Sequence, residues 1–307
     1  MRNSTTSRGD DWTILKLLEW TTSYFTSRAV ENPRAAAEIL LAHVLDLQRV
    51  DLYLRYDQPL VRTELERFKE LIRRRVLREP VAYITGCREF WSLKLAVSRD
   101  VLIPRPETEC LVEQTLAELS TTADAADRPY ILEPGTGSGA IVLALASSLP
   151  RSVCFASDVS ERSLKVALEN ARRHMLDGRI KFFCGDWTRP LRLGRASFDV
   201  IVSNPPYIPT GQIAALEPEI HLYEPLRALD GGLDGLVSAR RLITEAHRFL
   251  RPGGRLLLEI GHDQQAGIRQ IVASSGQYDN LVFTRDYAGC DRVAKMSKKP
   301  AEPQMTA

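Results

Sequence analysis

The chain has 307 residues, of which 44% are hydrophobic and 26% are charged, and its formal net charge is +2. These values are typical of a globular protein and argue against a disordered or fibrous chain. A protein that holds a long stretch of nucleic acid usually carries a larger basic excess, so we expect no stable nucleic-acid binding. No apolar run is long enough to span a membrane, so we expect no membrane partner either.

The five cysteines form no CxxC pair, and their number is odd: Cys87, Cys110, Cys154, Cys184 and Cys290. This pattern predicts a reduced, cytoplasmic protein without a disulfide framework or a metal site. The N-terminus lacks the apolar segment of a secretory signal. We expect frayed ends at residues 1–10 and 295–307.

Apolar residues at helical spacing mark the first 80 residues. Three groups predict three amphipathic helices: Ile14 to Phe25, Ala37 to Leu45, and Leu65 to Ile72. Asn32 before Pro33 is typical of an N-cap followed by proline at the first helical position. Short amphipathic helices pack as a bundle, so we expect a helical domain over residues 11–80 that recognises the partner.

The stretch from Arg62 to Arg78 is locally basic, with Arg73-Arg74-Arg75 at its centre. Most such runs are the solvated face of a helix. The alternative is a docking surface for an acidic or RNA-associated partner, and the sequence leaves both open.

Residues 81–104 favour a β-hairpin linker, because Leu93, Leu95 and Val97 alternate with other residues. From residue 105 to 295, strands and helices alternate, which predicts an α/β domain whose mostly parallel sheet is covered on both faces. The expected strands are Tyr130–Glu133, Ser152–Ser157, Ile180–Phe183, Val200–Ser203 and Arg255–Ile260. The expected helices are Glu107–Leu119, Ala140–Ser148, Glu161–His174 and Ser238–Leu250.

The first of these strands runs into a glycine-rich loop, Gly135-Thr136-Gly137-Ser138-Gly139, and a helix follows. Glycines let the backbone turn sharply and approach a ligand closely, and the helix N-terminus offers free N–H groups. The loop by itself fits a nicotinamide cofactor and S-adenosylmethionine equally well, or a turn with a structural role. Asp158 ends the next strand, where its carboxylate suits the two hydroxyls of a ribose. The alternative is helix capping by Asp158 or Ser160.

The third strand leads to Asp186 and Trp187. An adenine ring needs an acceptor for its amino group and an apolar wall, and these two side chains can supply them. An acidic residue beside an aromatic one is common at strand ends, so a structural role is equally open.

The fourth strand is followed by Asn204-Pro205-Pro206-Tyr207. Two prolines at a buried strand end stiffen the backbone in an extended form. The Asn204 side-chain oxygen and the Pro205 carbonyl can then accept the two N–H groups of a planar amide or amine, and the Tyr207 ring can pack on it. The tetrapeptide therefore predicts methyl transfer to a planar nitrogen, with catalysis largely by positioning. The alternative is a rigid surface turn.

Further segments carry a specific resemblance. Glu79 to Gly86 and Val101 to Glu109 lie before the glycine loop, and Glu224 to Leu229, Leu258 to Gly261 and Asp291 to Val293 lie after it. With the tetrapeptide, they resemble the PrmC/HemK family, which methylates glutamine in peptide chain release factors. One departure is that Glu133 and Pro134 stand where the family usually has Asp and an apolar residue, which puts a contact from Glu133 to the cofactor in doubt.

The resemblance implies a helical N-terminal domain, a hairpin linker and a Rossmann-like methyltransferase domain that uses S-adenosylmethionine. It implies class-1 peptide chain release factors as partners, with the glutamine of their Gly-Gly-Gln loop as acceptor. Cofactor contacts carry over to Gly135–Gly139, Asp158, Trp187 and Asn204, and the glutamine site carries over to Asn204–Tyr207. A helix-end salt bridge is the expected role of Arg105, Glu107 and Glu109, with pocket closure as the alternative.

Other activities remain in competition. A glutamine methyltransferase of a ribosomal protein shares the tetrapeptide, although the segment at Pro104–Glu109 argues against it. An adenine methyltransferase needs a nucleic-acid recognition domain and usually a stronger basic face. A dehydrogenase leaves Asn204–Tyr207 unexplained, and a catalytically silent binding module is disfavoured by the intact glycines.

Overall fold

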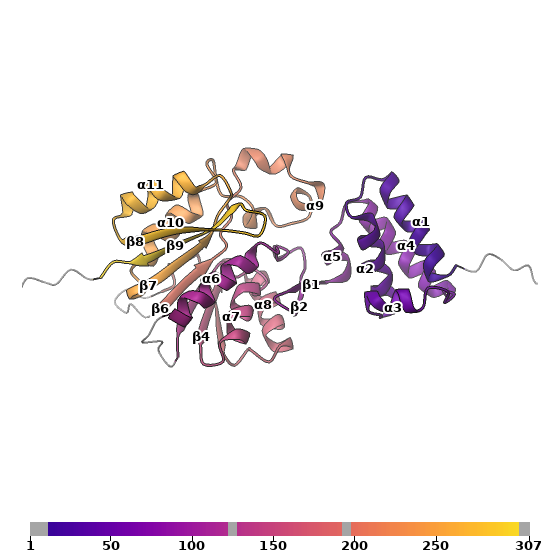
Figure 1. Cartoon of the computed structure of the whole chain (residues 1–307), viewed down its shortest axis with the longest axis horizontal. Helices are drawn as coiled ribbons and strands as arrows, with labels where there is room; N and C mark the ends of the chain where they lie inside the picture. The colour runs from indigo at the N-terminus through magenta and orange to yellow at the C-terminus, as the bar shows by residue number, and fades with distance from the viewer. Residues whose placement is uncertain (1–11, 122–127, 192–197, 301–307) are drawn as a thin grey trace, which may run out of the picture. The chain divides into compact units, whose positions relative to one another are not determined.

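The computed structural model describes residues 12–121, 128–191 and 198–300. These residues form two compact units, shown in Figure 1. The first holds the described chain through Gly86 together with residues 218–223, and the second holds residues 87–217 and the chain from Glu224 onward. The expected frayed end at residues 1–10 lies outside the described residues.

The first unit is helical, as the spacing of apolar residues predicts. Its helices are α1 (Ile14–Ser27), α2 (Pro33–Leu45), α3 (Arg49–Leu54), α4 (Arg62–Val76), α5 (Val81–Thr85) and α9 (Pro218–His221). Phe25, Leu40 and Phe68 lie at the centre of its core. Helix α3 was not predicted from the sequence, because it has only six residues and buries only Leu52. None of the helices that the structure describes is long and apolar enough to cross a membrane.

Asn32 holds the predicted N-cap position of α2, but its side chain does not cap the helix. Asn32 has a left-handed backbone with φ of +46°, and its side chain makes no capping hydrogen bond. The left-handed backbone is the physical reason, because capping residues ordinarily have an extended backbone that turns the side chain toward the first helical N–H groups. Pro33 nevertheless begins the helix, as expected.

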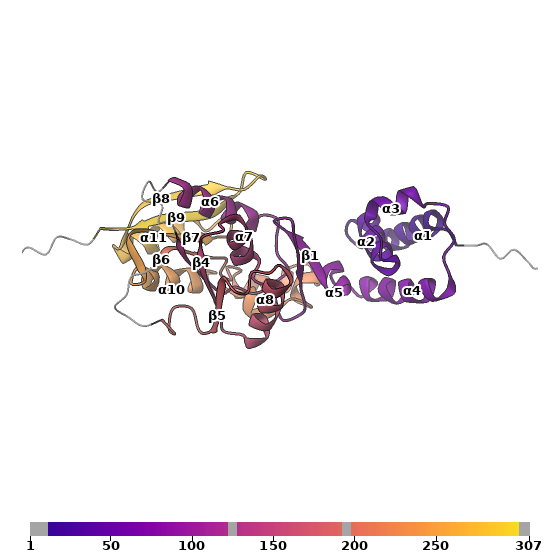
Figure 2. The same cartoon turned by 90° about the horizontal axis from the view of Figure 1, so that it is seen from below.

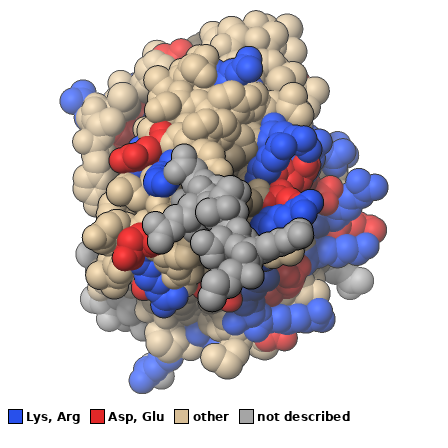
Figure 3. Space-filling model, turned by 90° about the vertical axis from the view of Figure 1, so that its right-hand side faces the viewer, with Lys and Arg blue, Asp and Glu red and all other residues tan. Residues whose placement is uncertain are grey.

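Several basic residues of α4 are paired with acids. Arg62 lies 2.8 Å from Glu66, and Arg73 lies 3.4 Å from Glu70, both on the exposed surface. Figure 3 shows Lys and Arg side chains gathered on the right of this view with Asp and Glu among them. Such mixed charge is what a solvated helix face presents. That interpretation therefore holds for the exposed residues of the stretch, whereas Arg75 is buried.

Residues 218–223 are held by the helical unit. The guanidinium of Arg75 donates to Glu219 at 2.7 Å, Arg78 donates to the same carboxylate at 2.9 Å, and the Tyr223 hydroxyl donates to the Leu77 carbonyl at 2.6 Å. Burial opposes the charged form of Glu219, but hydrogen bonds from both arginines outweigh it and lower its pKa. This short segment is thus fixed by charge rather than by an apolar face.

The second unit contains a seven-stranded sheet and a separate hairpin. The hairpin pairs β1 (Cys87–Phe90) with β2 (Leu93–Ala96). The sheet has the order β5-β4-β3-β6-β7-β9-β8. Its strands are β3 (Tyr130–Pro134), β4 (Val153–Asp158), β5 (Ile180–Cys184), β6 (Phe198–Ser203), β7 (Leu250–Glu259), β8 (Tyr278–Arg285) and β9 (Asp291–Lys298). All pairs are parallel except β7 with β9 and β8 with β9, so the predicted mostly parallel sheet is confirmed.

Helices cover both faces of this sheet, as Figures 1 and 2 show. On one face lie α6 (Thr108–Thr121), α7 (Ala140–Ser148) and α8 (Glu161–Arg173), and on the other α10 (Val237–Ala246) and α11 (Gln265–Ser275). Neighbouring strand residues serve opposite faces, because Ile131 joins the first core and Leu132 the second. Short 3-10 helices η1 (Thr210–Ala215) and η2 (Leu226–Ala228) lie in the long connection after β6.

Three expectations at the edges of this unit need correction. The predicted tail from residue 295 is wrong up to Lys298, because β9 pairs there with β7 and β8. The helix predicted to reach Leu250 ends at Ala246, and Leu250 already pairs with Phe198 in the sheet. The predicted linker of residues 81–104 is divided, since α5 belongs to the first unit and the hairpin to the second.

Candidate functional site

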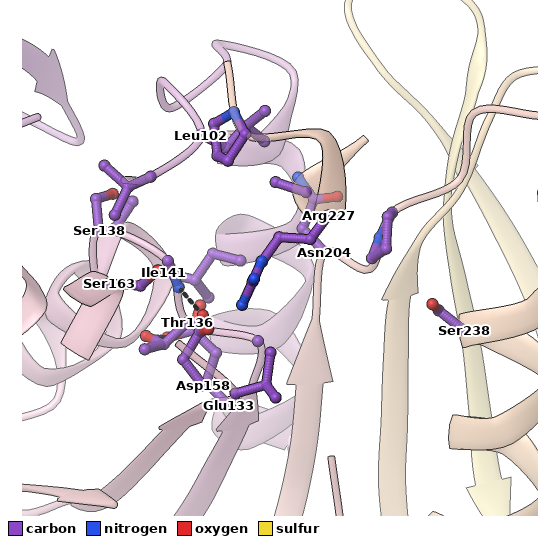
Figure 4. A pocket seen from close by; sticks show the side chains of 18 of the residues that line it. Leu102, Glu133, Thr136, Ser138, Ile141, Asp158, Ser163, Asn204, Arg227 and Ser238 are labelled. Atoms are coloured by element: carbon purple, nitrogen blue, oxygen red, sulfur yellow. Dashed lines mark hydrogen bonds between the residues drawn. The ribbon is translucent and has the colours of Figure 1, made fainter. Parts of the chain in front are cut away.

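A pocket of about 710 Å³ lies in the second unit where parallel strands end. Open α/β sheets bind ligands at the carboxyl ends of their strands, and the volume is that of a small-molecule site. The loops after β3, β4, β5 and β6 all contribute, as Figure 4 shows for part of the lining. The residues predicted for the site that line the pocket are Gly135, Thr136, Gly137, Ser138, Asp158, Asp186, Trp187, Asn204 and Pro206.

The glycine loop turns three times through the left-handed region. Gly135, Gly137 and Gly139 have φ of +73°, +54° and +84°, a conformation that glycine adopts without steric cost. The Thr136 N–H donates to the Ser157 carbonyl at 2.9 Å, which ties the loop to the end of β4. A Cβ at Gly135 would lie 3.1 Å from the Trp187 ring, whereas one at Gly137 would meet nothing within 4 Å. Gly135 therefore admits the indole, and Gly137 leaves open space beside the loop.

Glu133 is buried beneath this loop. Its Oε2 atom accepts the Thr136 hydroxyl at 2.6 Å and the Val142 N–H, in the first turn of α7, at 3.0 Å. Burial raises the pKa of Glu133 to about 8, the two hydrogen bonds lower it, and the nearby Asp158 carboxylate raises it. The Glu133 side chain thus links the glycine loop to α7. These two hydrogen bonds explain why an acidic residue stands near the end of β3.

Asp158 also supports the loop. Oδ2 accepts the Gly137 N–H and Oδ1 accepts the Ser160 N–H, both at 2.9 Å. Burial raises the pKa of Asp158, and these hydrogen bonds and the charge of Arg227 oppose that rise. Helix capping was the predicted alternative role of Asp158 or Ser160. Ser160 caps α8, because its hydroxyl accepts the Ser163 N–H. Asp158 lies in the pocket lining and keeps further lone pairs for a ligand.

Asp186 and Trp187 form the wall of the pocket after β5. Asp186 accepts from Arg241 at 2.7 Å and lies 3.1 Å from Arg189, so its carboxylate is held between two guanidinium groups. Trp187 has a left-handed backbone with φ of +55°, and its ring packs against Gly135 and the second core. An acceptor and an aromatic face are therefore adjacent here, while the adenine role of this pair stays a prediction.

The predicted tetrapeptide is divided between the pocket and the protein behind it. Asn204 and Pro206 line the pocket, whereas Pro205 and Tyr207 are not among its lining residues. The Asn204 Nδ2 group donates to the Thr108 hydroxyl at 3.2 Å, which leaves Oδ1 free to accept. The Tyr207 hydroxyl is directed to Glu259 at 3.4 Å, and burial raises the pKa of Tyr207 to about 12.

Several lining residues were not predicted from the sequence. Arg227 extends from η2 into the pocket toward Asp158 in Figure 4. Leu102 lies in the segment before α6, and Thr108 is the first residue of α6. These positions depend on two loops that fold over the strand ends. The path of such loops cannot be predicted from local periodicity. The available signal was the pair of family segments around Val101 and Glu224. For the first of them, pocket closure was the predicted alternative role of Arg105, Glu107 and Glu109.

One ion pair joins these two segments. Arg105 donates to Oε1 of the buried Glu224, whose Oε2 accepts the Ile103 N–H at 3.1 Å. Burial raises the pKa of Glu224, and the Arg105 charge and hydrogen bond act against this rise. Arg105 itself lines the pocket, while Glu109 accepts the Trp91 N–H at 2.8 Å. The salt bridge of Arg105 is thus made with Glu224 and not within the predicted helix-end cluster, and it fixes a loop over the pocket. No group of His, Cys, Asp and Glu in the described part of the chain could hold a metal ion.

Comparison with known proteins gives matches over both units. A family model described as "PrmC N-terminal domain" matches residues 16–86, and one described as "Methyltransferase domain" matches residues 127–300. Among solved structures, the hMettl16 catalytic domain in complex with an RNA hairpin has a TM-score of 0.56 at 17% identity, covering 74% of this chain and 82% of that chain. That likeness shows the fold alone, which is the α/β methyltransferase fold predicted from the sequence.

Curated relatives match over almost their whole length. A release factor glutamine methyltransferase of Geobacter sulfurreducens is 42% identical over 289 residues, which are 94% of this chain and 98% of the relative. One of Rhodopirellula baltica is 38% identical over 294 residues, which are 95% and 99% of the two chains. These matches confirm the resemblance read from the motifs: the chain belongs to the release factor glutamine methyltransferase family.

Proposed function

We propose that this chain methylates the side-chain amide nitrogen of the glutamine in the Gly-Gly-Gln loop of class-1 peptide chain release factors. The methyl donor is S-adenosylmethionine. The family to which the chain belongs is named for release factor glutamine methylation. The observation that supports the acceptor most directly is Asn204, whose Nδ2 group is engaged by Thr108 so that Oδ1 remains an acceptor at the pocket.

The pocket has the features that S-adenosylmethionine requires. It has about 710 Å³, a buried acid at Asp158 for the ribose hydroxyls, and an indole beside Gly135 for the adenine. The loop Gly135–Gly139 brings backbone close to the ligand without side chains in the way, most openly at Gly137. We assign cofactor binding to this loop, Asp158, Asp186, Trp187 and Asn204.

S-adenosylmethionine supplies an electrophilic methyl group on a sulfonium centre. Asn204 Oδ1 and the Pro205 carbonyl each accept one N–H of the glutamine amide, which aims the nitrogen and raises its electron density. Pro206 fixes the extended backbone, and Tyr207 anchors the end of the tetrapeptide. The nitrogen releases a proton to water after it gains the methyl group, so the site needs no strong base. Positioning of this kind recovers about 7–11 kcal/mol of a reaction barrier.

The test is transfer of labelled methyl from S-adenosylmethionine to a purified class-1 release factor, followed by mass spectrometry of the Gly-Gly-Gln peptide. We expect label on the glutamine and none when that glutamine is replaced by alanine. A ribosomal protein and DNA serve as competing acceptors in parallel reactions. Efficient labelling of either one, with none on the release factor, would overturn the proposed function.

A further inference from the structure

A buried carboxylate lies directly behind the tetrapeptide. Glu259 ends β7 and has 1% of its surface exposed, and its Oε2 atom has no hydrogen-bond partner among the described residues. Ser203 of β6 pairs with Leu258 of β7, so the register brings Asn204 and Glu259 side by side at the ends of neighbouring strands. A carboxylate in such a place is costly unless other groups use it, so Glu259 requires an explanation.

Two groups of the site use this carboxylate. The Tyr207 hydroxyl donates to Oε1 at 3.4 Å. Thr108 acts on the same carboxyl group, because its side chain lowers the pKa of Glu259. Thr108 in turn accepts from Asn204 Nδ2 at 3.2 Å. Glu259 is therefore connected to both ends of the tetrapeptide, to Tyr207 directly and to Asn204 through Thr108.

The direction of these hydrogen bonds follows from the chemistry of the groups. An ionised carboxylate only accepts, whereas a hydroxyl both donates and accepts. Thr108 therefore gives its proton to Glu259 and keeps its lone pairs for Asn204. The Asn204 amide must turn Nδ2 toward Thr108, and its oxygen is then the atom left for the pocket.

We propose that Glu259 is a positioning residue for methyl transfer, which sets through Thr108 the rotation of the Asn204 amide so that its oxygen, and not its amino group, faces the substrate. The inference rests on the proposed function and deepens it. Without the carboxylate, the Thr108 proton is free to turn to Asn204 Oδ1. The amide then turns over and presents an N–H donor to the N–H of the glutamine, which repels it.

Opposing influences act on the charge of Glu259. Burial raises the pKa of Glu259 to about 7, the hydrogen bond with Thr108 and the charge of Arg292 lower it, and the charge of Glu107 raises it. Arg292 is itself held by Asp286 at 3.0 Å and donates to the Ile260 carbonyl at 3.3 Å. The guanidinium therefore stays beside Glu259 without pairing directly with it.

The test compares wild-type chain, Glu259→Gln, Thr108→Val and the double variant, with release factor and S-adenosylmethionine as substrates. We expect Glu259→Gln to lower kcat about 10- to 100-fold, less than loss of a direct contact would. The glycine loop, Asp158 and Trp187 keep their places in the pocket lining, so the Kd for S-adenosylmethionine should change much less than kcat. The Tm should stay near wild type, because glutamine keeps the size of the side chain. Glu259→Gln should add little in the Thr108→Val background, because the two residues act through one connection.

Glu118→Gln is the matched control, since Glu118 is a largely buried carboxylate of the same unit that pairs with Arg255 and Lys295 away from the pocket. A wild-type kcat for Glu259→Gln, additive effects in the double variant, or a loss of kcat matched by losses of Tm and cofactor affinity would each overturn the positioning role while the proposed function stands. Absence of transfer by the wild-type chain would overturn the proposed function, and the positioning role with it.

Discussion

The side chain that does most in the proposed reaction is Asn204. Truncation to alanine removes the oxygen that accepts from the substrate amide, and loss of one such contact typically costs about 10²–10³ in rate. We expect single-turnover transfer from labelled S-adenosylmethionine to fall by this amount in Asn204→Ala.

Asn204→Gln is the matched variant, because it keeps the amide and moves it by one methylene. If position matters as argued, glutamine at this site should not restore the rate. Near-normal transfer in Asn204→Ala would remove Asn204 from the mechanism.

Glu133 predicts a specific dependence of stability on pH. Its pKa is raised in the folded protein to about 8 by burial, from an ordinary value of 4.5. Between these values the folded state binds a proton that the unfolded state has lost, so stability is highest below pH 4.5 and falls as pH rises toward 8. The slope is about 1.4 kcal/mol per pH unit for one group.

The measurement is urea unfolding of wild type and Glu133→Gln at several pH values from 5 to 8. The free energy of unfolding of wild type should decline relative to that of the variant as pH rises, because glutamine does not titrate. Parallel curves for the two proteins would show that Glu133 has no raised pKa.

At the scale of elements, the loop after β6 depends on a glycine far along the chain. Gly235 has φ of +71°, and a Cβ there would lie 2.4 Å from the Tyr207 carbonyl oxygen. The Gln264 side chain donates to the same oxygen at 2.9 Å. The loop that carries Asn204 is therefore seated against the backbone at Gly235.

We expect Gly235→Ala to displace this loop and to lower turnover about tenfold or more. Gly253→Ala is the matched control, since Gly253 has φ of +73° with nothing within 4 Å of a Cβ. Gly253→Ala should lower the free energy of unfolding by about 1–2 kcal/mol, because alanine disfavours a left-handed backbone, but it introduces no clash. Equal turnover in the two variants would mean that the contact at Tyr207 does not matter.

The elements that the sequence predicts well are those whose signal is local. The glycine loop, Asp158 and Asn204 each follow directly on an apolar strand, and parallel strands end at one edge, so their convergence could be predicted. Arg227, Thr108 and Glu259 could not be placed, because loops that fold over the strand ends and the register between β6 and β7 decide where they lie. Strand β8 was missed since its residues are mostly exposed or half-buried, without clean alternation.

At the scale of the whole molecule, the ion pair between Arg75 and Glu219 holds a distant segment to the helical unit. Both side chains are largely buried, at 5% and 12% exposure, so removal of the acid leaves an uncompensated charge. We expect Glu219→Gln to lower the free energy of unfolding of this unit by about 3–5 kcal/mol.

The control is Glu66→Gln, which breaks the exposed pair with Arg62 and should cost at most about 1 kcal/mol. Hydrogen exchange of residues 218–223 reports the local effect in each variant. Similar protection in both would contradict a special role for the buried pair.

The division of the chain into two units follows two sequence patterns, helical spacing in the first 80 residues and alternating strands and helices after residue 105. The assignment of residues 218–223 to the first unit has no such signal. Residues 218–223 have only a four-residue helix and no buried apolar side chain within it. Their assignment to the helical unit comes from Arg75, Arg78 and Leu77, which lie about 140 positions earlier. Contacts of such separation are invisible to local patterns.

The assignment of residues 218–223 to the helical unit has a consequence for recombination and for engineering. The six residues that belong with the helical unit are encoded between Asn204 and Arg227, both of which line the pocket. A recombination event that exchanged only the first 86 residues with those of a relative would therefore bring a foreign bundle to a native Glu219 and Tyr223. Chimeras of this chain should fold best when both pieces come from one parent, because its helical unit is discontinuous in sequence.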